Sequence, residues 1–203
     1  MACRLEKEEK GVFVMSTELV DSAILIVQLK IALLESKPSI WRRVMVPGQF
    51  SLYKLHKVIQ AAMGWTDAHL HQFNIDGLSY SIPSSEDWQP VIDERRHKVI
   101  QIASREKRKF VYEYDFGDGW MHNITVEKIT PPEAGVKYPV CIGGKRACPP
   151  EDVGGVWGYS EFLAAIGDPS HEEHDSYLTW IGGEFDPEEF VLEETNRVLQ
   201  RVR

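Results

Sequence analysis

The stretch YEYDFGDGW, residues 112–120, decides the fold of this 203-residue chain. Residues 109–115 alternate well enough for a strand, and Gly-Asp-Gly at 117–119 supplies the residues that a tight hairpin turn favours. Alternation resumes over residues 120–129, which predicts the returning strand. The sequence therefore predicts a central β-hairpin, around which the other elements are arranged.

The segment before this hairpin predicts two further strand pairs with one helix between them. Ser51 is a favourable N-cap, and apolar residues then recur at helical spacing until Gly64, where the pattern stops. The predicted elements, in chain order, are strands over residues 23–34 and 40–46, a helix over residues 52–63, and strands over residues 69–75 and 78–82. By analogy alone, this order is similar to a β-grasp-like roll, in which one helix crosses a mixed, mainly antiparallel sheet.

The C-terminal third predicts a layer of about three helices. Apolar side chains recur at helical spacing in residues 159–166, 171–181 and 191–202, and glycine or Asp-Pro separates these segments. The glycine- and proline-rich stretch before them suggests no regular element. The predicted fold class is α+β: a mixed, mainly antiparallel sheet with one crossing helix, plus the helical layer.

Two segments are predicted to lack regular structure. Residues 83–98 combine prolines, serines and many charges, which favours a long surface loop. Residues 1–20 show no sustained period and predict a flexible N-terminal extension, within which Met15 is an alternative start. We expect residues 21–203 to form a single domain.

Composition excludes some classes of protein. Hydrophobic residues make up 43% of the chain and charged residues 27%, as in ordinary globular proteins. No run approaches the roughly 18 apolar residues of a membrane span, so no membrane partner is expected. Three cysteines form an odd, sparse set, which indicates a reducing compartment and predicts a cytoplasmic location.

The net charge of −8 disfavours general nucleic-acid binding, because neutralisation of phosphates by Lys and Arg supplies most non-specific affinity. One local exception is the basic run over residues 95–109. If the run contacts DNA, the candidate side chains are Arg95, Arg96, Arg105 and Arg108. The alternative is a solvated surface loop, which is the usual nature of a charge run.

The hairpin concentrates carboxylates and imidazole within a few residues. Asp115, Asp118 and His122 are residue types that suit a divalent metal or general acid–base chemistry. The alternative is structural: Asp118 belongs to the turn, Asp115 bonds turn amides, and His122 is an ordinary strand residue.

Two other segments add candidates for the same site. His69 and His71 are two apart on one strand face, with His71 expected to point inward beside Phe73, where it either binds a metal or bonds a carbonyl. Asp152 lies in a glycine-rich stretch that suits a ligand-accepting loop. The candidate binding or metal residues are His71, Asp115, Asp118, His122 and Asp152. No cofactor is clearly implied beyond a divalent metal.

Several long motifs resemble one known family. They are YEYDFGDGWMHNITVE at 112–127, YPVCIGGKRACPPEDVGGVWGYSEF at 138–162, IWRRVMVP at 40–47, HLHQF at 69–73 and YLTWIGGEFDPEEF at 177–190. Together they resemble the plasmid open-reading-frame-three-like family, whose members include TnpR-like passenger proteins of insertion elements. The family is of uncharacterised function, so the resemblance implies a fold and an intracellular setting and brings no catalytic residues.

The leading functional expectation is a non-catalytic binding or interaction module associated with plasmid or mobile-element biology, with a protein or a small ligand as partner. It depends on the resemblance and on the lack of a complete catalytic set in the sequence. The alternative is a metal-dependent hydrolase that uses the Asp and His residues of the hairpin. Whether the protein is an enzyme is left open by the sequence.

Overall fold

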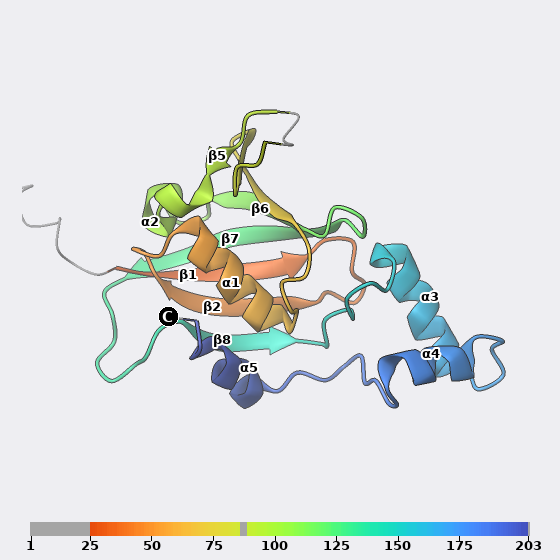
Figure 1. Ribbon diagram of the computed structural model, residues 1–203. Helices are drawn as coiled ribbons and strands as arrows, with labels where there is room; N and C mark the ends of the chain where they lie inside the picture. The colour runs from red at the N-terminus through yellow and green to blue at the C-terminus, as the bar shows by residue number, and fades with distance from the viewer. Residues whose placement is uncertain (1–24, 86–88, 203) are drawn as a thin grey trace, which may run out of the picture.

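The computed structural model describes residues 25–85 and 89–202, and its centre is one eight-stranded sheet (Figure 1). The strand order is β5-β4-β3-β6-β7-β1-β2-β8. The strands are β1 (Ile26–Leu33), β2 (Trp41–Pro47), β3 (His71–Ile75), β4 (Leu78–Ser81), β5 (Ile92–Asp93), β6 (Lys109–Tyr114), β7 (Trp120–Thr130) and β8 (Val140–Lys145). β4 and β5 run parallel, and every other neighbouring pair is antiparallel. The predicted mixed, mainly antiparallel sheet is confirmed.

The predicted hairpin lies at the middle of this sheet. β6 and β7 pair from Lys109 opposite Thr125 to Tyr114 opposite Trp120. Alternate residues of β6 are buried because they face α1 (Leu52–Met63), which lies across the sheet in Figure 1. The helix begins and ends where the sequence predicts. The Ser51 side chain accepts a hydrogen bond from the Lys54 amide, and Gly64 closes the helix in the left-handed conformation at φ 86°.

The helices after the sheet are α3 (Gly155–Gly167), α4 (His174–Ile181) and α5 (Leu192–Leu199). α3 and α4 pack on each other beside the strand ends, whereas α5 returns to contact β8 and α1 (Figure 1). In this contact Asn196 of α5 accepts a hydrogen bond from the Cys141 amide of β8 at 2.7 Å. The helices were predicted, but their expected grouping into one layer and the β-grasp-like roll are not confirmed.

The structure corrects the predicted loop over residues 83–98. The segment contains β5 and the 3-10 helix η2 (Glu94–Arg96), and α2 (Val99–Ile102) follows it directly. A two-residue strand is too short to show a period, and Glu94, a residue type normally placed at the surface, is fully buried. These elements depend on contacts made elsewhere in the chain.

β8 was also missed, because it contains two glycines in a stretch rich in turn residues. A Cβ atom at Gly144 would lie 2.6 Å from the Phe190 ring, so only glycine allows that ring to approach the strand. Within the described residues, no helix is long and apolar enough to cross a membrane. The predicted extension over residues 1–20 and the alternative start at Met15 lie outside the described residues.

Candidate functional site

Three potential metal ligands meet at the turn end of the central hairpin. His69 precedes β3, Asp115 follows β6, and Asp152 lies in the loop before α3. The His69 Nε2 atom is 3.6 Å from Asp115 Oδ2 and 3.1 Å from Asp152 Oδ1. Metal–ligand bonds of about 2.0–2.1 Å in a tetrahedron place the donor atoms roughly 3.3 Å apart. The spacing of these three residues, which we call the hairpin cluster, therefore fits a divalent cation.

Strand pairing and turn chemistry position this cluster. The Asp115 amide donates to the Leu70 carbonyl at 2.9 Å, which holds the residue after β6 beside the residue before β3. Asp115 Oδ1 accepts from the Gly117 amide at 3.0 Å, while Oδ2 faces His69. One carboxylate oxygen thus stabilises the turn and the other is available to a ligand, so the two alternatives weighed for Asp115 are compatible.

The His69 ring nitrogen lacks an aligned hydrogen-bond partner. Nε2 is buried and makes no hydrogen bond to any residue that the structure describes, although both carboxylates are within ion-pair distance. A hydrogen bond requires the N–H to point at its acceptor, and here it points at neither oxygen. A cation between the three donor atoms would satisfy the nitrogen and both carboxylates.

The cluster is open to solvent on one side and firmly anchored on the other. The Asp152 side chain is 70% exposed, whereas that of Asp115 is 12% exposed. Next to Asp152, the Glu151 carboxylate accepts hydrogen bonds from the hydroxyls of Tyr114 and Thr66. Burial and the bond to Glu151 raise the pKa of Tyr114, which therefore stays protonated as the donor. These bonds hold the Asp152 loop against the segment that carries His69.

His71 does not join this cluster. Its ring stacks on that of His56 at a centroid distance of 3.4 Å with parallel planes, and its Nε2 atom lies 2.9 Å from the buried Glu94 carboxylate. His56 in turn bonds Asp67 through Nε2 at 2.6 Å and the Tyr112 hydroxyl through Nδ1 at 2.8 Å. We call His56 and His71 the stacked histidine pair.

The stacked histidine pair is poorly suited to one metal ion, although its nitrogens and Asp67 are close together. An imidazole binds a metal through a lone pair in the ring plane, and two parallel planes 3.4 Å apart share no point. Burial, and then the neighbouring His71, lower the pKa of His56 to about 3, which keeps that ring neutral. The two histidines and their partners Tyr112, Asp67 and Glu94 form a hydrogen-bonded network inside the protein.

The other two hairpin candidates lie apart from the cluster. Asp118 has a structural partner, whereas neither ring nitrogen of His122 makes a hydrogen bond within the described residues. Asp118 Oδ2 accepts from the Gly154 amide at 3.1 Å, and a Cβ atom at Gly155 would lie 2.4 Å from the Asp118 carbonyl oxygen. Asp118 thereby fixes the start of α3 against the hairpin turn. His122 is fully buried beside Trp65, and burial lowers its pKa to about 4. Of the five predicted residues, Asp115 and Asp152 meet in the hairpin cluster, and the other three lie elsewhere.

Sequence reasoning gave His69 too little weight. Strand alternation favoured His71 because it shares a face with Phe73, but His69 precedes the first residue of β3 and need not follow that alternation. The missing signal was the pairing of β3 with β6, which places His71 opposite Tyr114 and so brings His69 next to Asp115.

The arginines proposed for nucleic-acid contact are largely engaged by carboxylates. Arg95 and Arg96 both pair with Asp93, at 2.8 and 3.3 Å, and Arg108 pairs with Asp76 at 2.6 Å. Arg105 is exposed. These acidic partners reduce the positive charge that the run offers to phosphates. Local DNA contact stays a prediction.

Comparison with known proteins agrees with this fold. The family model described as plasmid pRiA4b ORF-3-like protein matches residues 25–194. The uncharacterized protein y4hQ of Sinorhizobium fredii is 43% identical over 158 residues, which are 77% of this chain and 81% of that protein. The crystal structure of MM3350, a protein of unknown function from Methanosarcina mazei, matches with a TM-score of 0.77 and 38% identity, over 85% of this chain and 98% of that one. By its sequence and its fold, the chain belongs to the plasmid pRiA4b ORF-3-like protein family.

Proposed function

We propose that the protein is a single-domain cytoplasmic binding module that holds a divalent cation at the hairpin cluster. The observation that carries the proposal is the His69 Nε2 atom, which lies within 3.6 Å of two carboxylates and is aligned with neither. The family membership supports an association with plasmid biology, and a passenger role in insertion elements is part of the proposal. The partner that binds at the cation is a protein or a small ligand.

Charge supports a cation at this place. Asp115 and Asp152 bring two carboxylates to within 4.8 Å of each other, and Asp115 is largely buried. Like charges at this distance repel, and a buried carboxylate costs free energy unless it is paired. A divalent ion balances both charges, and a donor set of one imidazole and two carboxylates suits Zn²⁺ or Mn²⁺.

The test is calorimetric titration of the chelator-treated protein with Zn²⁺. We expect one ion per chain, and we expect Asp152→Asn to weaken binding by at least about tenfold, because it removes the charge of a direct ligand. Asp175→Asn is the matched control, since it removes an exposed carboxylate of α4 and should bind as the wild type does. Absence of binding, or equal affinity in Asp152→Asn, would contradict the proposal.

Metal-dependent hydrolysis is the second candidate. It is favoured by the three-residue donor set with the exposed Asp152 on its open side, because catalytic sites keep a coordination position for water. The Zn²⁺- or Mn²⁺-loaded protein should then hydrolyse p-nitrophenyl esters or phosphates, and Asp152→Asn should abolish the turnover. If the metal-loaded protein hydrolyses neither substrate class, the hydrolase is excluded and the binding module is retained.

A further inference from the structure

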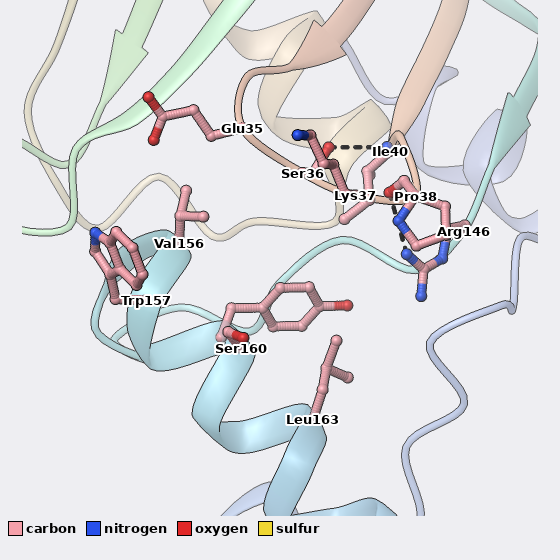
Figure 2. A pocket seen from close by; sticks show the side chains of 11 residues that line it. Glu35, Ser36, Lys37, Pro38, Ile40, Arg146, Val156, Trp157, Ser160 and Leu163 are labelled. Atoms are coloured by element: carbon pink, nitrogen blue, oxygen red, sulfur yellow. Dashed lines mark hydrogen bonds between the residues drawn. The ribbon is translucent and has the colours of Figure 1, made fainter.

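A pocket of about 320 Å³ lies between the β1–β2 turn and α3, away from the hairpin cluster (Figure 2). Lys37, Pro38 and Ile40 border it from the turn, and Val156, Ser160 and Leu163 border it from α3. Its volume falls at the lower end of the range of small-molecule sites, roughly 300–1,000 Å³. It shares no residue with the hairpin cluster, so any ligand here is independent of the proposed cation.

One end of the pocket carries a buried positive charge. Arg146 is 5% exposed, and its Nη1 atom donates to the Pro38 carbonyl at 3.1 Å, the bond drawn in Figure 2. Its Nε atom is 2.8 Å from a carboxylate oxygen of Glu188, whose side chain is 58% exposed, but the N–H is not aligned with it. A buried guanidinium with one misaligned, solvated partner retains donors for an anion.

The same pocket contains a hydroxyl without a partner. Tyr159 is 6% exposed, and its buried hydroxyl makes no hydrogen bond to any residue in the described part of the chain. Burial raises the pKa of Tyr159 to about 12, so the hydroxyl keeps its proton and can donate. Buried polar groups of native proteins are nearly always hydrogen-bonded, so an unpaired hydroxyl on a residue that lines a pocket points to a ligand that supplies an acceptor.

The other end of the pocket is aromatic. Figure 2 shows Trp157 at the opposite end from Arg146, with the apolar side chains of Val156 and Leu163 along α3. Trp157 is 84% exposed, which is unusual for the largest apolar side chain and leaves its ring free to stack on a ligand. Glu35 lies at the Trp157 end and disfavours a second anionic group there.

We propose that this pocket binds a small organic carboxylate with an apolar or aromatic body. The carboxylate accepts hydrogen bonds from the Arg146 guanidinium and the Tyr159 hydroxyl, and the body lies along α3 toward Trp157. The pocket offers one arginine and one tyrosine at this end, a donor set that matches the two oxygens of a carboxylate. Both ends of the pocket are thereby used.

The experiment is an NMR titration of the full chain that follows the indole N–H of Trp157. The probes are benzoate and phenylacetate, with benzamide as the neutral isostere of benzoate and inorganic phosphate as an anion without a body. We expect saturable shifts with the two carboxylates and none with benzamide or phosphate. The proposal would be overturned if neither carboxylate gave saturable shifts. It would also be overturned if benzamide or phosphate bound with the same affinity as the carboxylates.

Variants identify the donors. Tyr159→Phe should weaken carboxylate binding roughly 10- to 100-fold, the effect of one hydrogen bond to a charged group. Because the hydroxyl has no partner within the described chain, this variant should keep or raise the melting temperature without ligand, so a loss of binding cannot be ascribed to unfolding. Tyr177→Phe on α4 is the control, since Tyr177 does not line the pocket, and it should bind the carboxylates as the wild type does. Unchanged binding in Tyr159→Phe would reject the site without the need for an Arg146 variant, which would also lose the structural bond to the Pro38 carbonyl.

Discussion

The hairpin cluster and the stacked histidine pair both bring imidazole beside carboxylate, which in the pair comes from Asp67 and Glu94, and they differ in how their hydrogen bonds are completed. In the stacked pair, His56 uses both ring nitrogens and His71 meets a fully buried glutamate. In the hairpin cluster, His69 lies beside two carboxylates and bonds neither. The comparison teaches that proximity of imidazole and carboxylate is a poor criterion for function, and that an incomplete set of bonds beside carboxylates at a place open to solvent is a better one.

The largest effect on the unfolding free energy is expected at the stacked histidine pair, where the hydrogen bonds are complete. Glu94→Ala removes the fully buried carboxylate that lies 2.9 Å from His71 Nε2, and losing one partner of a buried pair costs about 3–5 kcal/mol of unfolding free energy. Urea denaturation of the wild type and the variant measures it. Glu172→Gln, an exposed change in the loop before α4, is the control and should stay within about 0.5 kcal/mol of wild type. A loss as small as the control's would remove the distinction between the two regions.

This network also shows where sequence reasoning ends. The central hairpin and α1 were predicted closely because alternation, Ser51 and Gly64 are local signals. The burial of Glu94 in η2 could not be predicted, because the histidine that it contacts belongs to β3, 23 residues earlier in the chain. The meeting of His69 with Asp152 depends likewise on a loop ordered by distant hydroxyls. The predicted candidates include Asp115 and Asp152 of the hairpin cluster but not His69, which reflects this division between local and distant causes.

A medium effect is expected from pH. His56 and His122 have pKa values lowered to about 3 and about 4 from the ordinary 6.5, because burial disfavours their charged forms. Below pH 6.5 these histidines are protonated in the unfolded chain but stay neutral in the folded chain. The unfolding free energy therefore falls as the pH is lowered, by up to roughly 1.4 kcal/mol per pH unit for each histidine. Urea denaturation between pH 7 and pH 5 measures the slope.

Replacing one of these histidines tests the assignment. His122→Phe keeps an aromatic ring beside Trp65 and removes one titrating group, so the slope should fall by about half on the same linkage. An unchanged slope in His122→Phe would mean that this ring is protonated in the folded protein.

The smallest effect is expected at the hairpin cluster in the absence of metal. Asp152→Asn changes a side chain that is 70% exposed and makes no aligned bond to His69, so the unfolding free energy should change by less than about 0.5 kcal/mol. With Zn²⁺ at 100 times its dissociation constant, the wild type should gain about 2.7 kcal/mol by mass action, and the variant should gain much less. Thermal melts with and without Zn²⁺ measure both quantities. A large loss in Asp152→Asn without metal would show that the cluster, like the stacked histidine pair, serves to hold the fold, because a binding site that waits for its ion contributes stability only once the ion is present.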